Sequence, residues 1–205
     1  MREKAFTKQA ANLFPYFAKF RGFYLVGGTA LALQIGHRLS VDFDLFSSEE
    51  LPSNLLQRIK QVLPASTISV TYHAPEQLNV LIDNIQTTFF YYNYPVIDPF
   101  VSYQDVSLAS IREIAAMKAF SVGKRLSYKD YVDWYVLLKE GHVKLDDMLS
   151  FCQKKFGNDF NDRLFLGQLA SLEDIPTQKI DFLRDAVDRT TIQRFLETTV
   201  RNFEL

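Results

Sequence analysis

The sequence predicts an α+β protein, in which a mixed sheet with flanking helices is followed by an all-helical region. Over about residues 1–100, short apolar and aromatic runs typical of strands alternate with segments of helical periodicity. Beyond Pro99 the apolar residues recur at spacings of three and four, the pattern of helices that bury one face. The composition, with 47% hydrophobic and 23% charged residues over 205 residues, is that of a folded chain.

The first half predicts a strand, a glycine turn and a helix in that order. Residues 23–26 (FYLV) form a short apolar run that ends at residues 27–28 (GG). Residues 29–35 (TALALQI) begin with a capping residue and continue with good helix formers as far as Gly36. The other elements expected here are helices over residues 3–20, broken at Pro15, and 49–63, and strands over residues 41–46, 67–72, 77–82 and 87–94, the last two joined at Asp83-Asn84.

The second half predicts helices alone, because no strand-like run is recognised after Pro99. No stretch rich in Pro, Gly or Ser separates the two halves as a free linker. We therefore expect an α+β lobe over residues 1–100 and a helical lobe over residues 101–205. The helices expected in it span residues 107–124, with Ser107 as the cap, 128–139, 145–156, 163–170 and 175–202.

Charge and cysteine content exclude several classes of protein. Lys and Arg number 23 and Asp and Glu 24, so no global positive charge indicates nucleic acid or anionic membrane, although a local basic groove stays open. The single cysteine excludes an internal disulfide, and the apolar sequence around Cys152 favours a small buried thiol over a nucleophile. With neither a secretory signal nor an apolar run of about 18 residues, we expect a cytoplasmic protein with no membrane partner.

An acidic pair is the first candidate site. Residues 41–46 (VDFDLF) alternate apolar and acidic side chains, so Val41 and its alternate neighbours should face the core while Asp42 and Asp44 share the other face. Their Cα atoms would lie about 6.7 Å apart. Because two adjacent carboxylates repel each other, a cation between them is expected, and oxygen ligands favour Mg²⁺ or Mn²⁺. The alternative is an acidic, solvated face of an edge strand.

Gly27, Gly28 and Thr29 are the second candidate site. Glycines let the backbone approach a phosphate, and the N-terminus of the following helix offers free N–H donors. Between the glycines and the acids, Arg38 can bind phosphate through two hydrogen bonds, and Ser40 can hydrogen-bond nearby. An ordinary strand-to-helix turn and a solvated loop are the alternatives. Together, however, a phosphate-binding turn at Gly27, Gly28 and Thr29 and a metal-binding pair of aspartates indicate a single ligand. That ligand is a nucleoside triphosphate with its metal ion.

Two further features of the sequence are blocks of residues with a characteristic order and spacing. The first block is residues 23–33 (FYLVGGTALAL) with residues 36–46 (GHRLSVDFDLF). The second runs from Lys118 through Arg125 to residues 129–135 (KDYVDWY). The first block resembles the first motif of the AbiEii/AbiGii toxin family of polymerase-beta-like nucleotidyltransferases, and the second is similar to that family's helical Lys and Arg/Lys-Asp-x-x-Asp motif. The resemblance spans about residues 20–140, and residues 141–205 match only in being helical.

The resemblance implies a nucleotidyltransferase-like N-terminal lobe and a helical lobe that contributes Lys118 and Asp130 to a shared cleft. Lys118 interrupts an apolar helical stripe and so needs an anion, unless it reaches solvent, and the resemblance favours phosphate. Asp130 and Asp133 share one face of the next helix, where a surface ion pair with Lys129 or Arg125 is the alternative. The resemblance favours Asp130 over Asp133, as the group that orients or deprotonates the nucleophile.

The activity that the resemblance implies is transfer of a nucleoside monophosphate from a nucleoside triphosphate to an acceptor hydroxyl. Asp42 and Asp44 would hold the metal ion, and Asp42, Asp44, Lys118 and Asp130 would be the catalytic residues. The family further implies a type IV toxin–antitoxin or abortive-infection system, with a cognate antitoxin and with tRNA or another RNA as the acceptor.

One departure from the family keeps other functions open. The superfamily usually carries a third carboxylate on a later strand, and residues 86–91 (QTTFFY) contain none, with Thr88 in its place. Asp130 could replace it, one metal could suffice, or the chain could bind nucleotide without turnover. The alternative function is therefore a degenerate nucleotide- or partner-binding module, for which the aromatic run 89–92 offers a contact surface unless it lies in the core. A metal-dependent Asp-x-Asp glycosyltransferase is disfavoured by the glycine turn.

Overall fold

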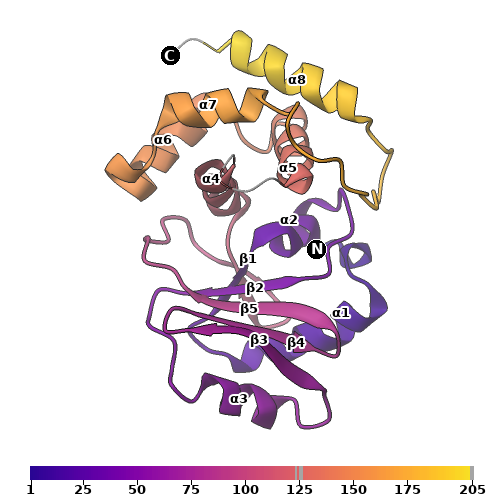
Figure 1. Cartoon of the computed structure of the whole chain (residues 1–205), viewed down its shortest axis with the longest axis vertical. Coiled ribbons are helices and arrows are strands. Elements are labelled where there is room, and N and C mark those ends of the chain that lie inside the picture. Colours follow the sequence, from indigo (N-terminus) through magenta and orange to yellow (C-terminus); the bar gives the residue numbers. More distant parts are fainter. Residues whose placement is uncertain (123, 125–126, 204–205) are drawn as a thin grey trace. The chain divides into compact units, whose positions relative to one another are not determined.

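The computed structural model describes residues 1–122, 124 and 127–203 (Figure 1). Arg125, part of the second motif, lies outside the described residues. The chain divides into two compact units, Met1–Ser110 and Ile111–Leu205. Each is considered on its own below.

The first unit, which is described throughout, is built on a seven-stranded mixed sheet with strand order β3-β4-β5-β2-β1-β7-β6. Strand β2 pairs antiparallel with β1 and parallel with β5, and β7 pairs parallel with β1. The α+β class predicted from the sequence is confirmed. The strands are β1 (Tyr24–Val26), β2 (Phe43–Ser47), β3 (Ile68–Ala74), β4 (Gln77–Ile82), β5 (Ile85–Tyr91), β6 (Val101–Tyr103) and β7 (Val106–Leu108).

Aromatic side chains of the N-terminal segment cover one face of this sheet. The ring of Phe17 lies 4.7 Å from that of Phe43, and Phe20 packs against Phe89 at 5.4 Å. Phe43 and Phe89 are fully buried as a result. The helix expected over residues 3–20 is broken into η1 (Glu3–Ala5), α1 (Lys8–Leu13) and η2 (Phe14–Lys19), with Pro15 in the first turn of η2.

The acidic segment forms a strand later than expected. Strand β2 begins at Phe43, so Asp42 precedes it, and Val41 is 38% exposed instead of facing the core. The reason is that pairing with β1 starts only at Asp44, opposite Val26. From Phe43 onward the predicted alternation of buried and half-buried side chains is confirmed.

Two hairpin turns of this unit have positive φ, and only the first was predicted. Asp83 and Asn84 both have positive φ and join β4 to β5, as predicted. The β6–β7 hairpin turns at Gln104 and Asp105, also with positive φ, and was not predicted because three-residue strands are too short to show periodicity. Ser107 therefore lies in β7 instead of capping a helix. The remaining helix, α3 (Leu55–Val62), is shorter than the expected residues 49–63 and leaves Pro52 in the preceding turn.

The regular elements described in the second unit are helices, as predicted, and residues 171–188 between the last two are irregular. Trp134 lies at its centre, fully buried, with its ring 5.2 Å from that of Phe165. The last helix begins only at Arg189, not at Ile175, because Asp188 caps it by accepting the amide of Thr191. The elements are α4 (Ile111–Ser121), α5 (Tyr128–Lys139), α6 (Leu145–Phe156), η3 (Gly157–Asp159), α7 (Asp162–Ala170) and α8 (Arg189–Arg201). Within the described residues, no helix combines the length and apolarity needed to cross a bilayer.

Cys152 is fully buried on α6, as predicted. Burial raises the pKa of its thiol to about 12, so the thiol stays protonated far above neutral pH.

We expect the native chain to resist Ellman's reagent at mildly alkaline pH, because the Cys152 thiolate is both unpopulated and shielded. The same chain in denaturant should release one equivalent of chromophore at once, since it has a single cysteine. Rapid labelling of the folded chain would contradict the buried position.

Candidate active site

The glycine corner, defined as Gly27 and Gly28, is the start of a helix. Helix α2 (Gly27–Ile35) follows β1 directly, so the two glycines form its first turn instead of a separate turn before Thr29. Val26, at the N-cap, offers no side-chain hydrogen bond to the free amides. The helix ends as predicted at Gly36, which is left-handed with φ +76°.

Two charged side chains pack against this corner. A Cβ atom at Gly27 would collide with Oδ2 of Asp44, and one at Gly28 would lie 2.5 Å from Nη2 of Arg38. Gly27 also has φ +70°, a conformation that other residues rarely adopt. The glycines are therefore required because a carboxylate and a guanidinium both approach the first turn of α2.

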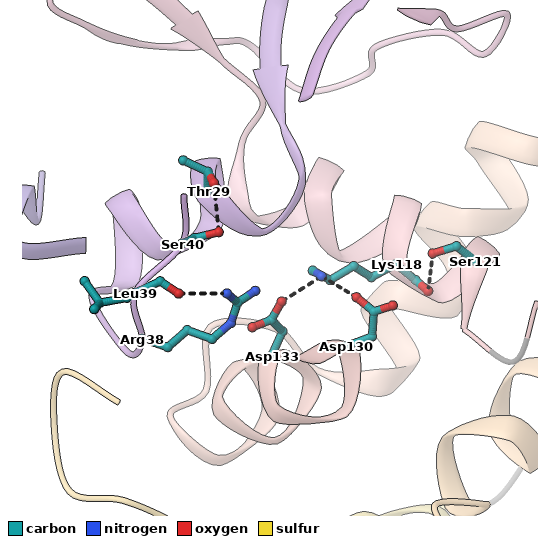
Figure 2. Close-up of polar contacts among 8 residues, drawn as sticks. All are labelled: Thr29, Arg38, Leu39, Ser40, Lys118, Ser121, Asp130 and Asp133. Carbon is teal, nitrogen blue, oxygen red and sulfur yellow. Dashed lines mark hydrogen bonds and ion pairs between the residues drawn. The ribbon is translucent and has the colours of Figure 1, made fainter. Parts of the chain in front are cut away.

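The loop between α2 and β2 is tied to the same helix turn (Figure 2). The Thr29 hydroxyl donates to the main-chain carbonyl of Asp42 and lies 2.8 Å from the Ser40 hydroxyl. Arg38 donates from Nη1 to the carbonyl of Leu39 at 3.1 Å. All the site residues expected in the first half of the chain thus belong to one neighbourhood of the first unit.

The charges at the corner favour a ligand with both phosphate and metal. Arg38 is only 2% exposed, and its guanidinium beside a helix N-terminus makes a site for an anion. Asp44 is half-buried and Asp42 exposed, and their carboxylates suit a hard cation. Among the described residues no group of three or more His, Cys, Asp or Glu side chains could hold a metal. An ion such as Mg²⁺ commonly takes one or two carboxylates and completes its shell with water and substrate phosphate.

Thr88 lies directly beside Asp44. The register of β2 with β5 pairs these two residues, and β4 pairs Asn79 with Thr88 in turn. All three are half-buried on the face of the sheet opposite Phe43. A hydroxyl therefore stands where a further carboxylate could have joined Asp44.

In the second unit, Lys118 on α4 lies between two carboxylates of α5 (Figure 2). Its Nζ is 2.7 Å from Oδ1 of Asp130 and 2.7 Å from Oδ2 of Asp133. All three side chains are at most 4% exposed, which rules out the surface ion pair considered above. Asp133, ranked below Asp130 from the sequence, is an equal partner, and the i, i+3 spacing was the signal for it.

Comparison with known proteins identifies the fold. The structure of a candidate nucleotidyltransferase from H. pylori matches this chain with a TM-score of 0.61 and 20% sequence identity. The match covers 95% of this chain and 94% of that one. JHP933 from Helicobacter pylori matches over 96% and 95% with a TM-score of 0.54 and 17% identity. The fold is thus shared with nucleotidyltransferase-like structures, as the sequence predicts.

Sequence relatives identify the family. The family described as nucleotidyl transferase AbiEii toxin, type IV TA system, matches residues 11–98. The uncharacterized protein aq_aa25 of Aquifex aeolicus (strain VF5) is 34% identical over 142 residues, which are 68% of this chain and 69% of that protein. The chain belongs to the AbiEii family of nucleotidyltransferase toxins.

Gly27→Ala should lower the free energy of unfolding because its Cβ meets both backbone strain and the Asp44 carboxylate. The matched control is Gly22→Ala, where φ is +88° but nothing lies within 4 Å of a new Cβ. We expect Gly27→Ala to lose about 1–3 kcal/mol more than the control in urea unfolding followed by circular dichroism. Equal losses would show that strain alone, and not the carboxylate, requires the glycine.

Lys118→Met should destabilise the second unit by about 3–5 kcal/mol, because it leaves two buried carboxylates without their ammonium. The fluorescence of Trp134, the single tryptophan of the chain, follows unfolding of this unit. The control Lys179→Met removes an exposed pair with Asp181 and should change stability by at most about 1 kcal/mol. A Lys118→Met variant as stable as this control would contradict the buried cluster.

Proposed function

We propose that the chain is a metal-dependent nucleotidyltransferase that moves a nucleoside monophosphate from a nucleoside triphosphate to an acceptor hydroxyl. The observation that carries the proposal is the glycine corner, over which Asp44 and Arg38 lie side by side on the first turn of α2. One group suits a cation and the other an anion, which is the pairing that a metal-bound triphosphate requires.

The phosphate side of the site consists of backbone amides and Arg38. The N–H groups of Gly28 and Thr29 belong to the first turn of α2. This N-terminal end of the helix carries the positive end of the helix dipole, which favours a bound anion. Arg38 adds a buried guanidinium that can contact phosphate oxygens through two hydrogen bonds. Ser40, held near Thr29, adds a hydroxyl at the rim.

The acidic side of the site would hold the metal through Asp42 and Asp44. A bound Mg²⁺ or Mn²⁺ would neutralise charge on the transferred phosphoryl group and on the leaving pyrophosphate. The main-chain carbonyl of Asp42 accepts from Thr29, which ties this residue to the helix turn that the Asp44 carboxylate also approaches.

The reaction forms one bond and breaks one. An acceptor oxygen attacks the α-phosphorus, the bond from that phosphorus to the bridging oxygen breaks, and pyrophosphate leaves with that electron pair. The proton of the acceptor hydroxyl passes to a base. The roles implied for Asp130 as this base and for Lys118 in phosphate binding stay proposals. In the structure the two groups contact each other, with 2.7 Å between Nζ of Lys118 and Oδ1 of Asp130.

Membership in a type IV toxin–antitoxin family supports three further proposals. These are a cognate antitoxin as partner, tRNA or another RNA as the acceptor, and a cytoplasmic location. The same membership argues against the glycosyltransferase alternative. Thr88 beside Asp44 favours one second candidate, a module that binds nucleotide without turnover, because it leaves the pair of aspartates without a third carboxylate on β5.

Asp44→Asn should abolish transfer of label from an α-labelled nucleoside triphosphate to total RNA, because it removes a charge from the proposed metal site without changing its size. The control is Asp105→Asn, an exposed turn residue whose positive φ asparagine tolerates, and it should transfer as the native chain does. Transfer that survives in Asp44→Asn would refute the assignment. Nucleotide binding by the native chain without transfer to any acceptor would establish the second candidate instead.

A further inference from the structure

Four aromatic rings form a connected group that begins on the same sheet face as Asp44. We define the sheet-face aromatic cluster as Phe46, Phe90, Tyr92 and Tyr94. Phe46 is two residues after Asp44 on β2, and its ring centroid is 5.1 Å from that of Phe90, its register partner on β5. Tyr92 lies 5.1 Å from Phe46, and Tyr94 lies 5.4 Å from Tyr92.

The cluster stays partly open, unlike the aromatic residues of the other face. Its four members are half-buried, whereas Phe43 and Phe89, which lie on β2 and β5 and face the other side of the sheet, are fully buried. The amide of Tyr92 donates to the carbonyl of Ser47 at 2.7 Å, which prolongs the β2–β5 pairing and holds its ring beside Phe46. Contiguous, partly exposed aromatic rings of this kind can serve as a binding face.

Strand order and register place Phe90 and Phe46 away from the glycine corner. Strands β5, β2 and β1 are neighbours in that order (Figure 1), with Gly27 following β1 and Phe90 on β5. On β2, Asp44 pairs with Val26 beside the corner, whereas Phe46 pairs with Tyr24, further from it. In an in-line displacement the attacking oxygen and the leaving group lie on opposite sides of the phosphorus. With pyrophosphate leaving toward the glycine corner, the acceptor has to approach over β5.

Flat rings and amides on one face suit nucleobases. Aromatic side chains stack bases whatever their identity, because every base has a π face. Asn79 and Gln77 lie on the same face of β4, opposite Thr88 and Phe90, and their side chains are 3.0 Å apart. Amide side chains of this type can donate to and accept from base edges. An acceptor hydroxyl on a protein side chain would need neither feature.

We propose that the sheet-face aromatic cluster is the acceptor site, where unpaired bases of an RNA stack on Phe46, Phe90 and Tyr92 and bring a terminal hydroxyl to Asp44. This inference rests on the proposed nucleotidyl transfer and adds the residues that hold the RNA acceptor.

The test is binding of a short fluorescein-labelled oligouridylate to the full chain without nucleotide, measured by anisotropy. Phe90→Leu keeps an apolar side chain and loses the ring, whereas Phe90→Tyr keeps the ring. We expect Phe90→Leu to weaken binding about tenfold and Phe90→Tyr to retain it. The control Tyr16→Leu removes a ring that is 46% exposed on η2, and it should bind as the native chain does.

An abasic oligonucleotide of the same length separates stacking from charge. We expect it to bind the native chain as weakly as the oligouridylate binds Phe90→Leu. In transfer assays Phe90→Leu should raise KM for the RNA acceptor and leave KM for the nucleoside triphosphate unchanged. Equal binding of abasic and uridylate probes, or native-like binding by Phe90→Leu, would overturn the proposal. Because the binding assay contains no nucleotide, its outcome is independent of whether Asp44→Asn abolishes transfer.

Discussion

The close approach of the Asp44 carboxylate to Gly27 is the constraint on which the first unit's site depends. It exists because β2 returns antiparallel to β1 with Asp44 opposite Val26, the last residue before α2 begins. The loop that makes this return is short, and Thr29 fixes it by bonding to Asp42 while Arg38 packs over Gly28. A change in register at this one pair would turn the acidic side chain to the other face of the sheet, where Phe43 now packs.

Buried charges organise the second unit in a similar way. Helix α4 carries Lys118 toward Asp130 and Asp133 of α5, and Glu113 toward Lys155 of α6 with 2.7 Å between the charged atoms. Both clusters are almost fully buried, and a buried charge that loses its partner is strongly destabilising. We infer that these pairs set the rotation of α4 between its two neighbours more sharply than its apolar residues could, since apolar contacts are not directional.

The sequence predicted most of the architecture and most of the site, and the failures have identifiable causes. Residues 77–82, 128–139 and 145–156 were predicted with their observed bounds because their periodicity is long enough to measure. The β6–β7 hairpin was missed because its strands have three residues each. The exposure of Val41 was missed because the alternation of apolar and acidic residues does not reveal where strand pairing starts. The importance of Asp133 was underestimated because a sequence shows a shared helix face but not what lies opposite it. The sequence predicts that Asp44 and Gly27 belong to the same site. How closely they approach depends on the register of β1 with β2, which the sequence does not show.

Gly27 also bears on how a gene of this kind tolerates mutation. Every amino acid reached from a glycine codon by one base change carries at least a Cβ atom, and at this position that atom meets a carboxylate. Every missense change there therefore places an atom against that carboxylate and disturbs the geometry of the glycine corner.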